Sequence, residues 1–390
     1  MAPSSPLAIL RRHWFPGLPA DRCGPVLGGG FSGSTVVAVR TPAGTRAVLK
    51  AFAAEIPPEH AAWIHRLMVH LTDSGIQAVP RLIATVDRQP GAARGDVLAT
   101  DPAATTLARG ADGRLWELAT WMPGAPVARP TEPQARAALA TMATIHRAAE
   151  RLPGEPARAG PAPAHLRRID AARRHLALGW DALPAATHPD SPLAAAVAAR
   201  VAAATPLVAT RAVRRAIEQV AASDPVVVPL SAVIRDLRAE HVLFTTRDAI
   251  AAPLGNAETV HPPANPGAGA IGGVIDFHAA GIDTPATDLA RLLGGWGELG
   301  KCSGGAEFDE GWGRVLAWYD EIRKVSENEL HLVPWLAATA VVFGLDQWFR
   351  WVLVERREFR SPADVVGRID RLLVDLPAAL VRLERRPCPV

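Results

Sequence analysis

The feature that most constrains this chain is a glycine-rich stretch that leads directly into a strand. Residues 27–39 read LGGGFSGSTVVAV, in which Gly28, Gly30 and Gly33 match the pattern G-x-G-x-x-G. In a dinucleotide-binding fold this pattern opens a helix, whereas the valines here favour a strand. A second apolar run follows at residues 46–52. We therefore predict a β-hairpin with the glycines at its bend; a glycine-rich turn without a ligand is the alternative. No Gly-Lys-Ser/Thr follows, which excludes a Walker A loop.

A turn at residues 41–45 joins this strand to another at 46–52, in which Lys50 ends the sequence Ala47-Val-Leu-Lys50. The chain has only three lysines, Lys50, Lys301 and Lys324, among 42 lysines and arginines, so it uses arginine almost everywhere as its cation. A compact ammonium on a flexible stem reaches α- and β-phosphates more readily than a guanidinium fork does. In kinases a strand lysine at this place contacts those phosphates. We predict a phosphate-binding lysine, with a solvated lysine at a strand end as the alternative.

Two aspartates lie beside apolar strands in the second half of the chain. Asp236 belongs to residues 231–244, which end in an apolar run, and Asp276 belongs to the strand-like residues 272–277. Metal-assisted phosphoryl transfer needs one carboxylate to accept the proton of the attacking hydroxyl and another to hold a cation against the phosphates. We assign the first role to Asp236 and the second to Asp276. An aspartate beside a strand is also a common turn former, so the assignment depends on the motifs that precede it.

A helix is predicted over residues 57–74, because prolines begin it, a glycine ends it and an apolar stripe runs along it. Glu59 on this helix is the candidate partner of Lys50, and Glu55 is the other candidate. Residues 115–124 are typical of a strand that ends at a Pro-Gly stop.

The rest of the chain divides into a strand-rich first part and a helix-rich second part. We predict strands at 78–85 and 96–100, an N-terminal helix within 1–20, an exposed loop at 251–270, and helices at 132–150, 163–180, 191–204, 206–222 and from 284 to about 385.

Composition limits the partners and the compartment. The net charge of +3 over 390 residues argues against nucleic acid as the main partner. Three cysteines without a C-x-x-C spacing fit a reducing compartment, and we expect a cytoplasmic protein. No apolar run approaches the length needed to span a bilayer, so we expect no membrane partner. The oligomeric state cannot be read from the sequence.

With these motifs in order, the chain resembles the aminoglycoside phosphotransferase and choline kinase group of the protein-kinase-like fold. The anchors are the glycine loop, Lys50, Met122-Pro-Gly124, Arg235-Asp-Leu237 and Val274-Ile-Asp-Phe277, and Asp288 is similar to an aspartate that ties a helix to the catalytic loop. The resemblance implies an α+β, bilobal fold with an antiparallel N-lobe at 1–119, a hinge at 120–124 and a mainly helical C-lobe at 125–390. It implies ATP and Mg²⁺ (or Mn²⁺) as cofactors. The site residues it implies are Asp236 and Arg238 for catalysis; Gly28, Gly30, Ser32, Gly33, Lys50, Glu59, Thr120 and Met122 for the nucleotide; and Asp276 and His241 for the metal.

Three residues depart from the family pattern. Ile234 stands where H-R-D-L-x-x-x-N has its histidine, His241 replaces the metal-binding asparagine, and His278 replaces the glycine of D-F-G. Because imidazole suits metals softer than Mg²⁺, His241 is expected to bind a different metal, to contact a phosphate, or to replace a metal. We therefore expect a small-molecule kinase, with a nucleotide-binding pseudokinase that acts as a scaffold or regulator as the alternative.

The acceptor is predicted only as a class, a hydroxyl-bearing small molecule such as an aminoglycoside, an amino alcohol or a sugar. Acidic residues late in the chain would suit a cationic acceptor, although a solvated helix face is the plainer interpretation. Tryptophans there could stack on a sugar or a quaternary amine, but packing in the core is the expected use of most of them. The acidic residues are Glu307, Asp309, Glu310, Asp320 and Glu321, and the tryptophans are Trp296, Trp312, Trp318, Trp335, Trp348 and Trp351.

Overall fold

The computed structural model describes residues 4–27, 34–86, 105–155, 157–180, 183, 191–245, 270–296, 308–359 and 361–385. The chain packs into two units. The first comprises Met1–Glu155, Asp236–Gly281 and Trp318–Arg323, and the second comprises Pro156–Arg235, Ile282–Ala317 and Lys324–Val390. Because the first unit takes residues from both sides of the predicted hinge, the division into lobes stays a prediction. The glycine-loop residues Gly28, Gly30, Ser32 and Gly33, the strand predicted at 96–100 and most of the loop predicted at 251–270 lie outside the described residues.

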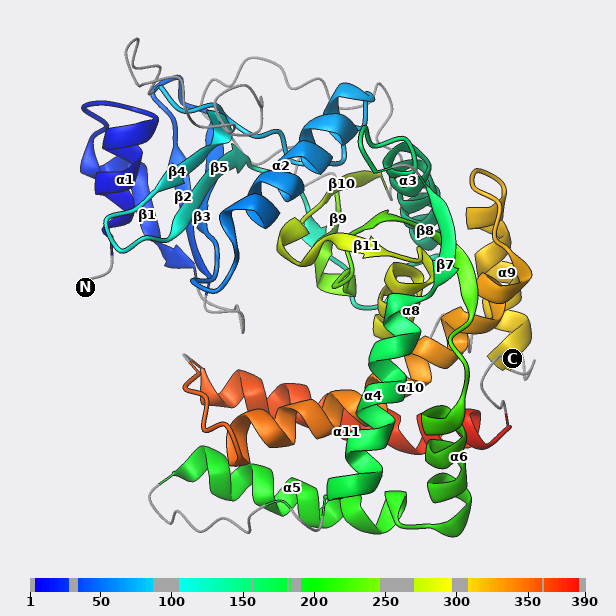
Figure 1. The fold of residues 1–390 in the computed structure, drawn as a ribbon. Coiled ribbons are helices and arrows are strands. Elements are labelled where there is room, and N and C mark those ends of the chain that lie inside the picture. The colour runs from blue at the N-terminus through cyan, green and yellow to red at the C-terminus, as the bar shows by residue number, and fades with distance from the viewer. Residues whose placement is uncertain are drawn as a thin grey trace. The chain divides into compact units, whose positions relative to one another are not determined.

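A five-stranded antiparallel sheet begins the first unit, with strand order β1-β2-β3-β5-β4 (Figure 1). Alternating apolar residues put one face of β2 and β3 in the core, where they pack with Ile9 and Leu10 of helix α1 and with Trp14 directly after it. The strands predicted at 36–39 and 46–52 form the antiparallel pair β2 and β3, and the N-terminal helix is confirmed. The bend that was predicted at the glycines lies outside the described residues. The bounds are α1 Pro6–His13, β1 Cys23–Leu27, β2 Thr35–Arg40, β3 Arg46–Ala51, β4 Leu107–Arg109 and β5 Leu115–Thr120.

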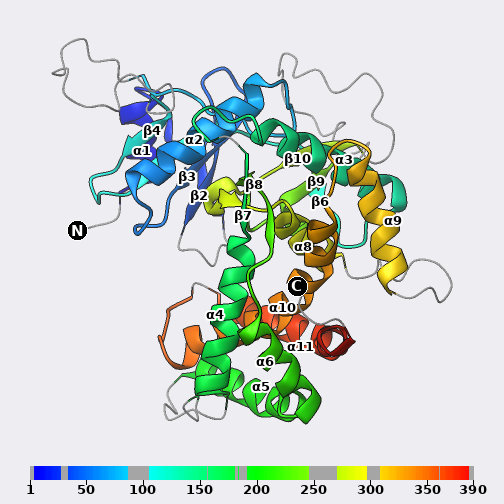
Figure 2. The same ribbon diagram turned by 45° about the vertical axis from the view of Figure 1, so that its right-hand side comes forward.

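Two helices complete the scaffold of the first unit. Helix α2 spans Pro58–Asp73, close to the predicted 57–74, and helix α3 spans Glu132–Ala149, close to the predicted 132–150 (Figure 2). The α3 helix begins at a capping box, in which Thr131 and Gln134 satisfy each other's backbone N–H groups. Its inner face packs against α2 and β10.

The predicted strand at 78–85 is wrong as a regular strand, because only an isolated bridge between Leu82 and Ala119 forms there. Pro80 has no N–H to contribute to a ladder. The backbone of this segment is instead divided between two elements. The Ala78 carbonyl accepts from the Val274 N–H, and the Ile83 N–H donates to the Leu118 carbonyl.

A small second sheet, with strand order β10-β9-β6, holds the segments that carry the predicted aspartates. Its strands are β6 Ala125–Pro126, β9 Val242–Phe244 and β10 Ile271–Val274. Gly272 and Gly273 of β10 lie against the predicted hinge: a Cβ at Gly272 would overlap the Pro123 carbonyl oxygen, and a Cβ at Gly273 would lie 2.6 Å from Met122 Cβ. The two glycines therefore allow the hinge backbone to approach the strand that leads to Asp276.

This close approach gives the first prediction, that Gly272→Ala destabilises the protein by about 1–3 kcal/mol, the usual cost of an overpacked site. The atom that a new methyl group would meet belongs to the backbone and cannot rotate away. Urea unfolding at neutral pH measures the change. Gly367→Ala is the matched control, since its Cβ would meet only the far end of Arg371 at 3.9 Å within helix α11. Equal stability of Gly272→Ala and the wild type would contradict the prediction.

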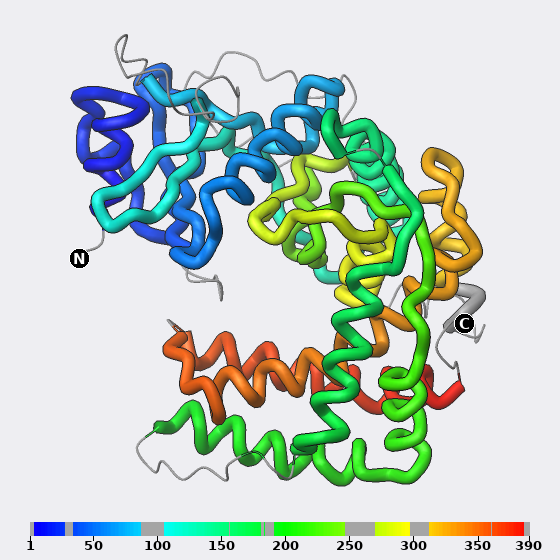
Figure 3. The backbone as a smooth tube through the Cα atoms, viewed as in Figure 1, coloured from blue at the N-terminus to red at the C-terminus, as the bar shows by residue number. Residues whose placement is uncertain are grey.

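The second unit consists of helices and one three-stranded sheet with order β11-β8-β7. Figure 3 shows α5, α10 and α11 running beside one another. Helices form in the regions predicted at 163–180, 191–204, 206–222 and after 284, but the break predicted at 205 is wrong, because the helix there continues through Pro206 to Val208. The short strands β7 and β11 were not predicted. The bounds are β7 Arg158–Pro161, α4 Pro163–Leu178, α5 Pro192–Val208, α6 Arg211–Ala222, β8 Val227–Val233, β11 Gly281–Asp283, α8 Ala286–Gly295, α9 Phe308–Asp320, α10 Glu327–Leu353 and α11 Pro362–Arg385.

Helix α10 corrects the expectation that no apolar segment reaches the length of a membrane span. By length and composition it is the one continuous helix of the described residues that could cross a bilayer, and α5 with α6 would pass only as a bent pair. However, 78% of the most apolar window of α10 is buried inside the protein. Its apolar side chains, Trp335 and Trp348 among them, therefore serve as core.

Candidate functional site

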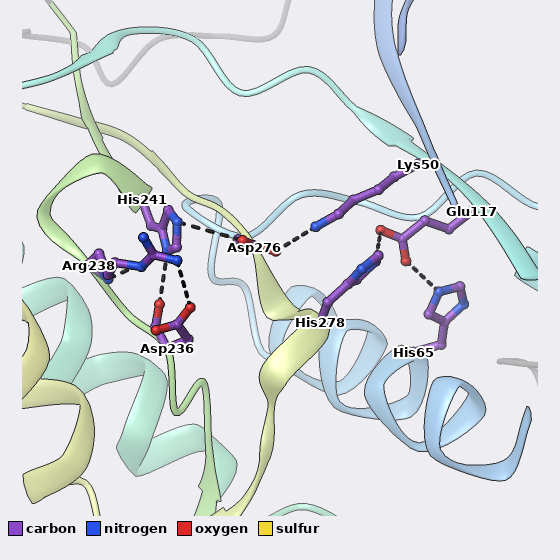
Figure 4. Close-up of polar contacts among 8 residues, drawn as sticks. All are labelled: Lys50, His65, Glu117, Asp236, Arg238, His241, Asp276 and His278. Carbon is purple, nitrogen blue, oxygen red and sulfur yellow. Dashed lines mark hydrogen bonds and ion pairs between the residues drawn. The ribbon is translucent and has the colours of Figure 1, made fainter. Parts of the chain in front are cut away.

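Lys50 and Asp276 meet at the centre of the candidate site, although they are 226 residues apart in the chain (Figure 4). Lys50 Nζ lies 2.5 Å from Asp276 Oδ1. Lys50 projects from β3, and Asp276 follows the end of β10. The structure thus brings together the predicted phosphate lysine and the predicted metal aspartate, both within the first unit.

The backbone at Asp276 is held in an unusual conformation. Asp276 has φ 69° and ψ 63°, in the left-handed region, and it precedes the short 3-10 helix η5 at Phe277–Ala279. The residue before it is fixed by the Ile275 N–H, which donates to the His241 carbonyl. Burial raises the pKa of the Asp276 carboxyl, but the charges of Lys50 and His241 outweigh burial and hold that pKa well below its usual range. Asp276 is therefore ionised at neutral pH.

The predicted catalytic aspartate, Asp236, is held by a side chain of its own loop. Arg238 Nη2 donates to Asp236 Oδ2 at 3.0 Å, and Arg238 Nη1 donates to Glu240 Oε1 at 3.2 Å. Burial works against the charged form of Arg238, yet Asp236 and Glu240 raise its pKa. A permanently charged guanidinium thus fixes the Asp236 carboxylate, whose side chain is 29% exposed.

His241 bridges the two aspartates. Its Nδ1 lies 2.9 Å from the Asp236 carbonyl oxygen and 3.4 Å from the backbone nitrogen of Arg238. Because a carbonyl oxygen only accepts, the shorter contact makes Nδ1 the donor. Its Nε2 lies 3.6 Å from Asp276 Oδ2. A histidine oriented by a carbonyl through one nitrogen presents the other nitrogen to a ligand or a metal.

These residues fit a divalent cation that is held partly by phosphate oxygens. The Asp276 side chain is 37% exposed and supplies hard oxygen ligands. Nε2 of His241 stands beside it as a softer ligand. No cluster of three or more metal-binding side chains occurs among the residues that the structure describes. Mg²⁺ in kinase sites is commonly bound by one or two carboxylates together with substrate phosphates, which this arrangement allows.

In the second unit, Asp288 performs the role that the resemblance implied. Its Oδ2 accepts from the Ile234 N–H at 2.8 Å, and its Oδ1 accepts from the Arg235 N–H at 2.6 Å. Asp288 is fully buried in α8. Arg235, with φ 67°, is thereby held in a left-handed conformation directly before Asp236 in the chain.

Glu117 is a site residue that the sequence analysis missed. It lies on β5 opposite Lys50 of β3, and it is 6% exposed. Its Oε2 accepts from His65 Nε2 at 2.8 Å, and its Oε1 accepts from His278 Nε2 at 3.0 Å (Figure 4). Burial raises the pKa of this carboxyl, but His278 and His65 overcome burial and hold that pKa well below its usual range. One ionised carboxylate thus joins helix α2 to the segment after Asp276.

Comparison with known proteins agrees with this geometry. A profile described as the phosphotransferase enzyme family matches residues 25–252, more than half of the chain. The chain belongs to the phosphotransferase enzyme family. A homoserine kinase from Gluconacetobacter diazotrophicus is 33% identical to this family member over 107 residues. That match covers 27% of the chain and only about a third, 32%, of the relative.

Two solved structures share the fold of this phosphotransferase family member. A spectinomycin phosphotransferase in complex with ADP and spectinomycin has a TM-score of 0.61 at 12% identity and is covered over 99% of both chains. An amicoumacin kinase in complex with AMP-PNP and Ca²⁺ has a TM-score of 0.54 at 12% identity, over 95% of this chain and 92% of that one. The predicted α+β, protein-kinase-like fold is confirmed.

Glu59, the candidate partner of Lys50, lies exposed in the first turn of α2, and Lys50 pairs with Asp276 instead. Thr120 is the last residue of β5, and its N–H donates to the Arg81 carbonyl. The nucleotide contacts of Thr120 and Met122 stay predictions. Met122 is buried against Gly273, so its side chain supports the strand that leads to Asp276.

The acidic and aromatic residues of the C-terminal part have structural contacts. Glu321, in the turn after α9, pairs with Arg136 at 2.9 Å, and both side chains are more than half exposed, as expected of solvated surface residues. Of the other acidic residues, Glu307 lies outside the described residues, as do the side chains of Asp309 and Glu310. The tryptophans Trp296, Trp312, Trp318, Trp335 and Trp348 are buried, which confirms packing as their main use.

The low pKa of Glu117 gives a second prediction, on acid stability. Folding favours the ionised carboxylate, so Glu117 stabilises the protein above the unfolded-state pKa of about 4.3. This contribution is lost as the pH falls from that value toward the lower pKa of the folded state. Between about pH 5 and about pH 3, the difference in unfolding free energy between the wild type and Glu117→Gln should therefore narrow. Urea unfolding at both pH values measures it, and a difference that stays constant would contradict the prediction.

Proposed function

We propose that this chain is an ATP-dependent phosphotransferase that moves the γ-phosphate to a hydroxyl of a small molecule. The observation that carries the proposal is a set of three contacts between ionisable side chains in the first unit. Lys50 pairs with Asp276, His241 lies beside Asp276, and Arg238 pairs with Asp236. A phosphate lysine, a cation carboxylate and a base carboxylate are what phosphoryl transfer requires. Family membership and the nucleotide-bound structures of the same fold support the proposal.

In the proposed reaction, each residue acts on a defined atom. Lys50 binds phosphate oxygens of ATP, as an ammonium released from its pair with Asp276. Asp236, oriented by Arg238, accepts the proton of the acceptor hydroxyl. The acceptor oxygen then bonds to the γ-phosphorus while the bond to the β,γ-bridging oxygen breaks, and ADP leaves. A divalent cation, Mg²⁺ or Mn²⁺, would be held by Asp276 with His241 and would neutralise charge on the phosphates.

Positioning and charge neutralisation supply most of the rate enhancement in such reactions. The fixed orientation of Asp236 and the ionised state of Asp276 are therefore the properties that matter for this chain. No feature of the site specifically favours the pseudokinase alternative. The cytoplasmic location belongs to the same proposal, since the chemistry uses ATP.

The acceptor class follows from the proteins that this chain resembles. One solved structure of the same fold holds spectinomycin, and a partial relative is named a homoserine kinase. We therefore test an aminocyclitol, an amino alcohol and a simple sugar as acceptors. The experiment measures transfer of radiolabelled γ-phosphate from ATP by the purified full chain, with Mg²⁺ and with Mn²⁺. Labelled product with at least one acceptor is expected. Nucleotide binding without transfer to any acceptor and without ATP hydrolysis would overturn the enzymatic proposal.

A further inference from the structure

The carboxylate of Glu117 is fully engaged, yet the reaction proposed above does not use it. Each of its oxygens accepts one histidine N–H, from His65 on α2 and from His278 in η5. His65 is in turn fixed from its other side, where Nδ1 lies 2.6 Å from Thr106 Oγ1. All of these groups are buried or nearly so. A buried ionised carboxylate is costly unless it is hydrogen-bonded on both oxygens, and here it is.

The His278 ring has a second contact besides the hydrogen bond from its Nε2 to Glu117. Its ring stacks on Phe52, with ring centroids 3.9 Å apart and an interplanar angle of 12°. Phe52 follows β3, two residues after Lys50, and its N–H donates to the Leu115 carbonyl of β5. Two adjacent strands of the sheet, β3 through Phe52 and β5 through Glu117, therefore fix the position of His278.

Asp276, two residues before His278, needs such support. A non-glycine residue in the left-handed region, as Asp276 is with φ 69°, is strained and persists where its surroundings hold it there. On the side before Asp276, the Ile275 N–H bond to His241 provides one anchor. On the side after it, the contacts of His278 provide the other. The sheet thus reaches Asp276 in two ways: directly through Lys50 of β3, and through His278, the histidine that replaces the glycine of D-F-G.

We propose that Glu117 is a positioning residue, which holds the Asp276 carboxylate in place through His278. Phe52 supports His278 by stacking on its ring, and His65 fixes the other oxygen of Glu117. Glu117 touches neither the nucleotide nor the reacting atoms in this role. Its contribution to metal-dependent nucleotide binding rests on the function proposed above, whereas its hold on the backbone of Asp276 does not.

The variants are chosen to separate positioning from simple stabilisation. Glu117→Gln keeps the size of the side chain, but an amide cannot accept from both histidines through its two ends. His278→Phe keeps a ring for Phe52 and removes the hydrogen bond to Glu117. Glu329→Gln is the matched control, because Glu329 is a 1%-exposed glutamate in the second unit that caps helix α10.

The first readout is the Mg²⁺ concentration that gives half-maximal ATP binding, measured by calorimetry on the full chain. We expect Glu117→Gln and His278→Phe to raise this Mg²⁺ concentration by about 10-fold, the lower end of the cost of removing groups that orient a metal ligand. Glu329→Gln should leave this Mg²⁺ dependence unchanged, because the amide oxygen can still accept from Ser326 in the capping box of α10. If Glu117→Gln lowers the melting temperature but leaves the Mg²⁺ dependence at the wild-type value, the role is structural only and the proposal is overturned.

The second readout does not depend on nucleotide. Crystal structures of the wild type and Glu117→Gln should show that Asp276 leaves its left-handed conformation, or loses its pair with Lys50, in the variant alone. An unchanged Asp276 in Glu117→Gln would overturn the proposal even if the enzyme proves active. If the wild type binds no ATP with either metal, the proposed function fails, and this structural readout still decides whether Glu117 positions Asp276.

Discussion

Asp236→Asn is expected to lower kcat for phosphate transfer by about 10²- to 10⁴-fold, the usual contribution of a general base. An amide cannot accept the proton of the acceptor hydroxyl, but it can still receive the hydrogen bond from Arg238 Nη2 that orients the side chain. The loop therefore keeps its shape, and ATP affinity should stay near the wild-type value. Initial rates of transfer and calorimetric titration of ATP measure the two quantities on the same protein.

Asp370→Asn provides the control for this variant. Asp370 forms an exposed ion pair with Arg200 on α5, so the same chemical change there should leave kcat unchanged. Turnover by Asp236→Asn at the wild-type rate would remove Asp236 from the mechanism. A parallel loss of ATP affinity would show that Asp236 also holds the nucleotide.

Asp276→Asn is expected to abolish the Mg²⁺-dependent part of ATP binding. The carboxylate that pairs with Lys50 and faces His241 would become a neutral amide, which is a weaker ligand for a hard cation. Asparagine tolerates the left-handed backbone as well as aspartate does, so the substitution isolates the charge from the conformation. Titration of ATP with Mg²⁺, with Mn²⁺ and with EDTA measures the change.

Comparing ATP binding with Mg²⁺ and with Mn²⁺ distinguishes a His241 that binds the metal from one that contacts a phosphate. If ATP binding by the wild type depends on a metal and is stronger with Mn²⁺, the imidazole is supported as a ligand, since nitrogen suits the softer ion. Metal-independent binding of equal strength in the wild type and Asp276→Asn would contradict the assignment of Asp276. It would also indicate that Lys50 and His241 hold the phosphates directly.

Local pattern was sufficient for most elements of this chain. The hairpin that ends at Lys50 and the long helices follow from residue spacing, because alternation and a 3.6-residue period are properties of neighbouring residues. Short strands such as β6, with two residues, are too brief to show a period. The segment at 78–85 has a strand-like composition, but Pro80 lacks an N–H, and the backbone of the segment bonds partly to β10 and partly to β5. A regular ladder therefore does not form.

Residue types and their order along the chain indicated the chemistry, through a rare lysine, two aspartates beside strands, and a series of motifs that resembles one family. Which of these groups meet depends on how distant segments pack. Glu117 is a lone glutamate in an apolar strand, which was a signal of a buried carboxylate, but its partners His65 and His278 lie 52 and 161 residues away. Glu59 had the expected helix, yet its position in the first turn left it in solvent. Hydrogen bonds and ion pairs form between atoms a few ångströms apart, and only the packing of distant segments sets those separations.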